Sequence, residues 1–218
     1  MSGLGTLTRD DLVELAPVLR RAVTLDAAGL ARLRASEHQV SVLLRLPFGV
    51  LVARTLAVKR GDEPFDATVQ ASDLLTWLDG DDSATPARRD AEWRTGLPPA
   101  RGWQRIDTVP DEVVRGLVRA GAQALTDAAG REGVPGAQPR MEVADALLDS
   151  VVLTVSADAD ELSAPVTLRV LSALTRMGFL PRGSHVAVDT SGRWTRVAAE
   201  YGSVYAERPG RGLQLLSR

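Results

Sequence analysis

The sequence predicts an α+β protein in which helices pack against antiparallel β-meanders. Two observations lead to this prediction: apolar residues recur at helical spacing in each half of the chain, and short runs of alternating apolar and polar residues follow them. The runs are too closely spaced for helical crossovers, which favours antiparallel pairing. Both halves therefore look like a helix followed by strands, either as two similar lobes or as contributions to one sheet.

The composition is that of an ordinary globular chain, with 218 residues, 44% hydrophobic, 25% charged and a formal net charge of −2. This charge does not attract nucleic acid or an anionic membrane to the chain as a whole. The absence of cysteine excludes disulfides, thiol nucleophiles and iron–sulfur ligation. No apolar run reaches the roughly 20 residues of a membrane span, and no signal peptide is recognisable. The heavy use of Ala, Val, Leu and Arg is typical of bacterial coding, so we expect a soluble, cytoplasmic bacterial protein.

Residues 1–80 are expected to form an N-terminal lobe that opens with a helix and continues as strands. Thr8 is the expected N-cap of the helix, because acidic residues and then regularly spaced leucines follow it. Pro17 lies inside this helical stretch and is expected to kink or split it. Ser72 is the expected N-cap of a second, brief helix. Strands are expected at 30–35, 39–46, 50–58 and 67–70, with a turn at 47–49.

Residues 81–102 are expected to be a linker or a functional loop, because they are polar and rich in proline and arginine. Trp93 and Trp103 bracket its arginine-rich part, which includes Arg94 and Arg101. This segment could be a lid over a pocket, a docking loop for a partner, or a linker that the two tryptophans pin to the rest of the protein.

Residues 103–218 are expected to form a C-terminal lobe, unless the whole chain is one continuous domain. Pro110 begins a predicted helix that ends at Gly130. Ser163 is the expected N-cap of a further helix, with Gly178 at its C-terminal end. Residues 151–156 fit either a helix or a strand. The remaining expected strands are 103–109, 185–188, 193–199, 204–207 and 213–216, and a second loop is expected at 131–139.

Familiar catalytic and nucleotide-binding motifs are absent from the sequence. It contains no G-x-x-x-x-G-K-[ST] loop, no G-x-G-x-x-G after a strand and no G-x-S-x-G elbow. His38 and His185 lack the spacing of a histidine metal site, and the acidic clusters at 79–82 and 158–161 lack that of a calcium loop. In an extended strand His185 would lie about 13 Å from Asp189, too far for a local triad. We therefore expect no cofactor and no metal ion.

The most distinctive segment is the predicted hairpin region at 185–207, where aromatic residues alternate with arginine. If Gly192 closes a three-residue loop, Asp189 faces Arg193 across the hairpin. Trp194 and Arg196 would then share one face, where they could cover the core, anchor a protein partner or stack on nucleic-acid bases. The candidate interface or ligand residues are Trp194, Arg193, Arg196, Tyr201, Tyr205, His185, Trp93, Arg94 and Trp103.

No single function follows from the sequence. The favoured hypothesis is a non-enzymatic binding or assembly module, a homo-oligomer that uses a β-sheet surface or edge, because antiparallel meanders offer both. One alternative is an enzyme for a small metabolite, with a site assembled from scattered Arg, Asp and Glu side chains and His185. Another is a weak nucleic-acid binder acting through Arg193, Trp194 and Arg196. A protein partner or self-association is thus expected and a small molecule is possible, whereas nucleic acid and membrane are not expected.

Overall fold

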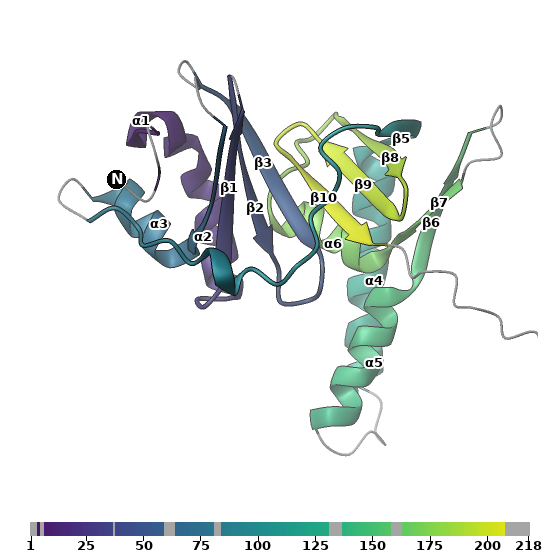
Figure 1. Ribbon diagram of the computed structural model, residues 1–218. Helices are drawn as coiled ribbons and strands as arrows, with labels where there is room; N and C mark the ends of the chain where they lie inside the picture. Colours follow the sequence, from purple (N-terminus) through teal and green to yellow (C-terminus); the bar gives the residue numbers. More distant parts are fainter. Residues whose placement is uncertain are drawn as a thin grey trace, which may run out of the picture.

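One continuous sheet of eight antiparallel strands, drawn from both halves of the chain, organises the computed structural model (Figure 1). The structure describes residues 4, 7–36, 38–58, 64–80, 84–130, 137–157 and 163–207. The strand order β4-β1-β2-β3-β10-β9-β8-β5 confirms the predicted α+β class with antiparallel meanders. The first half contributes β1 (Leu30–Ser36), β2 (Gln39–Arg45), β3 (Leu51–Ala57) and β4 (Phe65–Gln70). The second half contributes β5 (Gln104–Pro110), β8 (His185–Ser191), β9 (Trp194–Ala199) and β10 (Gly202–Glu207).

Helices lie on one face of this sheet, which we call the helical face; the opposite side is the outer face. The first half supplies α1 (Arg9–Leu12), the 3-10 helix η1 (Val13–Leu15), α2 (Ala16–Leu25) and α3 (Ala71–Asp79). The second half supplies α4 (Asp111–Gly130), α5 (Ala137–Asp149) and α6 (Leu168–Arg176), together with a separate hairpin of β6 (Val151–Ser156) and β7 (Ser163–Thr167). A 3-10 turn, η2 (Asp90–Glu92), lies between the halves. No helix in the described ranges is both long and apolar enough to cross a membrane.

A single apolar core lies between the sheet and the helices of both halves. Leu19 of α2 and Leu174 of α6 are fully buried in it. Val52 of β3 and Val204 of β10 are paired across the junction between the halves, and both are fully buried. The core therefore continues from one half to the other through the same pair of strands that joins the sheet.

The start of the chain folds as its sequence indicates, apart from one cap. Thr8 caps α1, and its hydroxyl and the Asp11 carboxylate form a reciprocal capping box. The helical stretch is split ahead of Pro17, which lies in the first turn of α2. The expected N-cap at Ser72 is wrong: α3 begins at Ala71, directly after β4. The Ala71 N–H donates to Gly29 O at 3.0 Å, so sheet pairing at the end of β4 sets the helix start.

The second half departs from the sequence prediction around residue 163. Ser163 is not a helix cap, because residues 163–167 form β7 and α6 starts only at Leu168. β7 pairs with β6, so residues 151–156 are a strand and not a helix. Gly178 follows α6 with φ +69°, as a C-terminal glycine should. The predicted strand at 213–216, most of the loop at 131–139, and the acidic residues 81–82 and 158–161 lie outside the described residues.

The hairpin of β8 and β9 has a shorter loop than expected. Gly192 has φ +54°, but the turn consists of two residues, and Ser191 pairs with Trp194. Asp189 consequently faces Arg196, and the predicted pairing with Arg193 is wrong. A two-residue turn matches the right-handed twist of the flanking strands, which favours it over the three-residue alternative.

The two halves of the chain are tightly packed where β3 meets β10, and a substitution at Gly202 tests this packing. A Cβ added at Gly202 would lie 2.7 Å from Ala53 O and 2.7 Å from the Phe179 ring, whereas one added at Gly116 on α4 meets nothing within 4 Å. We expect Gly202→Ala to lower the free energy of unfolding by about 1–3 kcal/mol through overpacking. Gly116→Ala should raise it by up to about 1 kcal/mol, because alanine favours a helix. Urea denaturation measures both, and equal effects would contradict this account of the junction.

Candidate functional site

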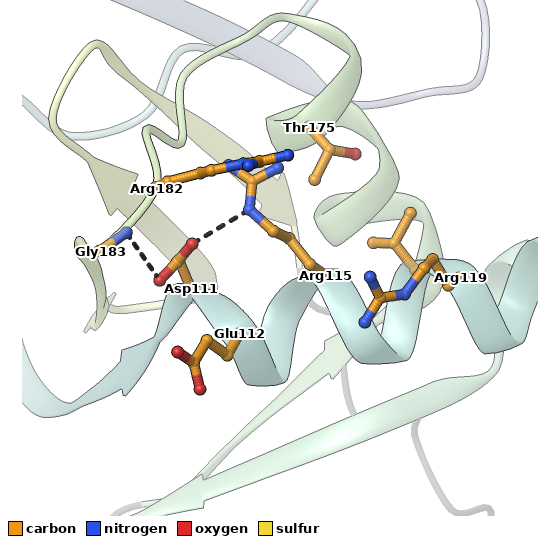
Figure 2. Close-up of a pocket in the computed structure, with 8 residues that line it drawn as sticks. Asp111, Glu112, Arg115, Arg119, Thr175, Arg182 and Gly183 are labelled. Carbon is orange, nitrogen blue, oxygen red and sulfur yellow. Dashed lines mark hydrogen bonds and ion pairs between the residues drawn. The ribbon is translucent and has the colours of Figure 1, made fainter.

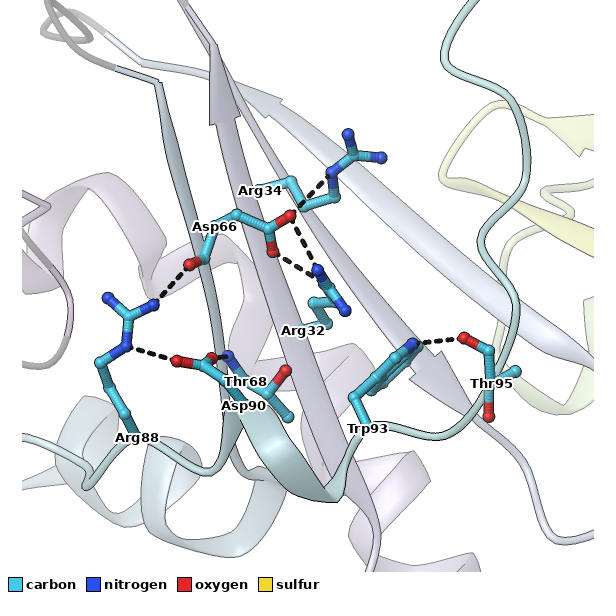
Figure 3. A network of polar contacts seen from close by, with 8 residues as sticks. All are labelled: Arg32, Arg34, Asp66, Thr68, Arg88, Asp90, Trp93 and Thr95. Atoms are coloured by element: carbon cyan, nitrogen blue, oxygen red, sulfur yellow. Dashed lines mark hydrogen bonds and ion pairs between the residues drawn. The ribbon is translucent and has the colours of Figure 1, made fainter.

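The segment between the halves first runs along β4 and occupies the main-chain groups at its outer edge (Figure 3). The Arg89 N–H donates to Thr68 O at 2.7 Å, and the Thr68 N–H donates to the Asp90 carboxylate at 2.7 Å. The Arg88 guanidinium donates to Asp66 O at 2.7 Å. An unpaired strand edge can accept a strand from another chain, so residues 88–90 close this edge to such pairing.

Contacts with β1 and β4 hold the same segment in place. Arg32 donates two hydrogen bonds to the Asp66 carboxylate, at 2.7 and 2.9 Å, which raises the pKa of Arg32. The Trp93 ring lies 5.8 Å from the same guanidinium, and its indole N–H donates to Thr95 O at 2.7 Å. Burial alone would raise the pKa of Asp90, but the hydrogen bonds from the Thr68 N–H and the Arg88 guanidinium lower it below its ordinary value of 3.8.

The chain then crosses the outer face and forms one wall of a groove of about 740 Å³. Small and polar side chains of β2 and β3, such as Ser41 and Thr55, form part of the groove lining. Phe65 and the two prolines at 98–99 add apolar surface. Arginine and aromatic side chains complete it: Arg34, Arg101, Trp103, Arg196 and Tyr205.

A buried carboxylate orients the arginine and aromatic end of this groove. Asp189, whose side chain is 2% exposed, accepts from Arg196 at 2.8 Å and from Arg105 at 3.0 Å. The Arg196 guanidinium lies 4.6 Å from the centre of the Trp103 ring, and that ring lies 5.6 Å from Tyr205. The Trp103 indole donates to Pro99 O at 2.9 Å. The side chains are therefore fixed before any partner arrives.

Three of the candidate residues named from sequence, Trp103, Arg196 and Tyr205, thus meet in one groove. Trp194 is 7% exposed and lines a smaller cavity of about 210 Å³ together with Arg94 and Tyr205. Trp93 and Arg94 line a further cavity of about 380 Å³ at the end of β2. Six of the candidate residues named from sequence therefore line one of these three cavities: Trp93, Arg94, Trp103, Trp194, Arg196 and Tyr205.

The other candidates lie apart from the groove. Arg193 is in the β8–β9 turn and forms an ion pair with Glu207. Tyr201 lies in the turn before β10, where a hydrogen bond with Glu200 raises its pKa. His185 is exposed at the start of β8 and lines none of the cavities named above. Because Trp194 is buried and Arg193 and Arg196 are paired with acids, this geometry does not favour the predicted nucleic-acid platform.

No sequence pattern indicated that Arg34 or Phe65 would line the groove. Arg34 lies on β1 and Phe65 on β4. These two strands are distant in the sequence, and their pairing is visible only in the tertiary structure. The proline pair at 98–99 is visible in the sequence, and its position between Trp93 and Trp103 is the one signal that points to this wall.

The fold is similar to that of bacterial sliding clamps. The chain matches the DNA polymerase III subunit beta from Pseudomonas aeruginosa and the DNA polymerase sliding clamp from Bacillus subtilis, each with a TM-score of 0.57 and 13% identity over 92% of this chain and 63% of the clamp. The clamp from Caulobacter crescentus gives 0.56 and 12%, over 97% and 68%. The chain thus spans about two thirds of these proteins, and at such identity the likeness defines the class of fold and nothing more.

Within that class, the protein belongs to the family described as "Domain of unknown function (DUF8185)", whose sequence model matches residues 98–211, more than half of the chain. A second model, "Domain of unknown function (DUF8010)", matches residues 2–96. The two matches meet in the segment between the edge of β4 and the groove. Among curated proteins, none matches the sequence.

The hydrogen bonds of residues 88–90 to the edge of β4, which we call the β4 cap, lead to a prediction about amide exchange. Replacing Asp90 with alanine removes the acceptor of the Thr68 N–H, so we expect that amide to exchange at least about tenfold faster at neutral pH. Glu92→Ala is the matched control, because it removes the same charge and, among the described residues, the Glu92 carboxylate pairs with Arg89 alone, at 3.3 Å. Site-resolved hydrogen exchange by NMR makes the comparison, and equal rates in the two variants would contradict the role of Asp90.

The protection of the Thr68 amide against exchange is expected to decrease at acidic pH. The pKa of Asp90 is lower in the folded state, so its stabilisation is present above pH 3.8 and is lost as the pH falls below that value. In the wild-type protein we expect Thr68 protection, corrected for intrinsic exchange, to persist at about pH 5 and to decline below 3.8. Asp90→Asn keeps an acceptor oxygen but cannot titrate. A decline of the same size in this variant would show that another group is responsible.

Proposed function

We propose that the protein is a non-enzymatic assembly module that holds an acidic, extended segment of a partner protein in the outer-face groove. The observation that carries the proposal is the groove itself. Its lining contains three arginines: Arg34 is paired with Asp66 and Arg196 with the buried Asp189, whereas Arg101 has no ion pair among the described residues. Tryptophan, tyrosine and arginine are the residues that contribute most at protein interfaces, and the groove combines all three.

The acid in the lining is not available to repel an acidic partner. Asp66 is bound by Arg32 at 2.7 Å and by Arg34 at 3.6 Å. Arg101 is exposed and has no ion pair among the described residues. Within the described part of the chain, the groove therefore offers a cation without an acidic partner beside aromatic and proline surface, which suits a segment with carboxylates next to an apolar anchor.

The sliding-clamp fold supports the assembly part of this proposal. The similar solved structures are a subunit of DNA polymerase III and two DNA polymerase sliding clamps, so the fold occurs in a protein that is one subunit of a larger complex.

Peptide selection tests the groove. A library of 12-residue peptides displayed on phage should yield acidic sequences with an aromatic or proline anchor. Their synthetic forms should bind Trp103→Ala and Arg101→Glu at least about tenfold more weakly than the wild type, because these variants remove an anchor and a cation. Arg176→Glu is the control, since it makes the same charge change on α6, away from the groove. Selected peptides that are not acidic, or that bind all variants equally, would contradict the proposal.

A second candidate is self-association through the other edge of the sheet. β5 ends the strand order and pairs only with β8 among the described strands, whereas β4 is closed by residues 88–90. Two copies could therefore extend the sheet by antiparallel pairing of β5. Size-exclusion chromatography with light scattering should show a dimer that dissociates on dilution. A strict monomer at high concentration would exclude this arrangement.

A further inference from the structure

A separate cavity lies on the helical side of the molecule, away from the groove (Figure 2). It has a volume of about 450 Å³, within the roughly 300–1,000 Å³ usual for small-molecule sites. The start of α4, the end of α6 and the loop before β8 surround it. Its lining consists of Asp111, Glu112, Arg115, Val118, Arg119, Thr175, Arg182 and Gly183. Three of these eight residues are arginine, from two different elements.

Arg115 is fixed in position by a buried carboxylate. Its Nε donates to the Asp111 carboxylate at 3.0 Å, and one Nη donates to Leu180 O. The Asp111 side chain is 6% exposed, and its second oxygen accepts the Gly183 N–H at 3.2 Å. A guanidinium has five N–H groups, so these two bonds hold Arg115 rigidly and leave donors for a ligand. The same carboxylate also ties the loop of Arg182 to α4.

Two further guanidiniums share the cavity without a carboxylate partner in the described part of the chain. Arg119 is one helical turn beyond Arg115, and the Arg182 side chain extends past the Arg115 guanidinium in the direction of Thr175 (Figure 2). The lining carries three arginines and two acids, a net charge of +1. Asp111 is already engaged, and Glu112 projects away from the Arg115 guanidinium (Figure 2). Like charges gathered in one cavity are unfavourable unless an anion neutralises them.

Elsewhere among the helices, several arginines are neutralised within the chain. Arg20 on α2 pairs with Asp79 at 2.5 Å. Arg169 on α6 pairs with Asp145 at 3.3 Å and with Asp149 at 2.8 Å. In the cavity, by contrast, Arg119 and Arg182 have no acidic partner among the described residues, and the concave surface brings them together with Arg115. A small anion fits this arrangement better than a nucleic-acid backbone, which would need a stripe of cations.

We propose that this cavity binds a small phosphate monoester, with Arg115 as a pre-oriented donor and with Arg119 and Arg182 closing on the other oxygens. A phosphate dianion matches the charge of the two unpaired guanidiniums, and guanidinium–phosphate pairs give strong, often bidentate hydrogen bonds. This site is independent of the outer-face groove, so it can exist whether or not the groove binds a peptide.

Calorimetric titration of the full chain at low ionic strength tests the proposal, with glycerol 3-phosphate, inorganic phosphate and succinate as probes. We expect glycerol 3-phosphate to bind more tightly than succinate. Its affinity should rise as the pH increases through about 6, where a phosphate monoester gains its second charge. Arg119→Gln and Arg182→Gln should each weaken binding at least about tenfold. Arg45→Gln, the same charge change at an exposed residue at the end of β2, should leave it unchanged.

Several outcomes would overturn the proposal. One is the absence of binding by either phosphate compound up to about 10 mM; another is equal weakening in Arg182→Gln and Arg45→Gln. Tighter binding of succinate, without the pH response, would assign the cavity to dicarboxylates. Tighter binding of a DNA duplex, lost in the same two arginine variants, would assign it to nucleic acid. Circular dichroism confirms that each variant is folded, which is expected because Arg119 and Arg182 are exposed.

Discussion

The pairing of β3 with β10 joins the two halves of the chain, and the rest of the structure depends on it. In the part of the chain that the structure describes, three residue pairs make this junction, from Ser203 opposite Ala53 to Tyr205 opposite Leu51. Val52 and Val204 carry the core across it on the helical face, while Ala53 and Tyr205 line the groove on the outer face. The close approach at Gly202 leaves no room for a side chain. A small contact therefore fixes both the common core and the alignment of the groove's two sides.

The segment between the halves has two structural roles that are physically coupled. Residues 88–90 occupy the edge of β4, and residues 98–103 form a wall of the groove. The indole N–H groups of Trp93 and Trp103 donate to carbonyls only two and four residues away. These local hydrogen bonds stabilise the segment between the β4 edge and the groove wall. Because one continuous segment makes both contacts, loss of the β4 cap would also reduce the order of the groove wall.

A buried carboxylate organises arginine on each face of the sheet. Asp189 orients Arg105 and Arg196 on the outer face, and Asp111 orients Arg115 on the helical side. In both places the acid is almost fully buried and the arginine is partly exposed, so the acid fixes the guanidinium while leaving donors toward solvent. A chain with a net charge of −2 thereby presents local basic sites. The sequence alone predicted Arg196 but not Arg115, because an arginine on an amphipathic helix looks like any solvated residue.

The sequence by itself determined the local features: the class of most elements, the cap at Thr8, the split before Pro17 and the positive φ of Gly178 and Gly192. These follow from side-chain periodicity and from backbone sterics within a few residues. It also identified Trp103, Arg196 and Tyr205 as a surface of interest. Only the tertiary structure decided that β4 pairs with β1, that residues 163–167 form a strand, and that Arg34 and Phe65 meet those aromatics. Strand partners are chosen by long-range competition for hydrogen bonds and core burial, and local sequence does not record that competition.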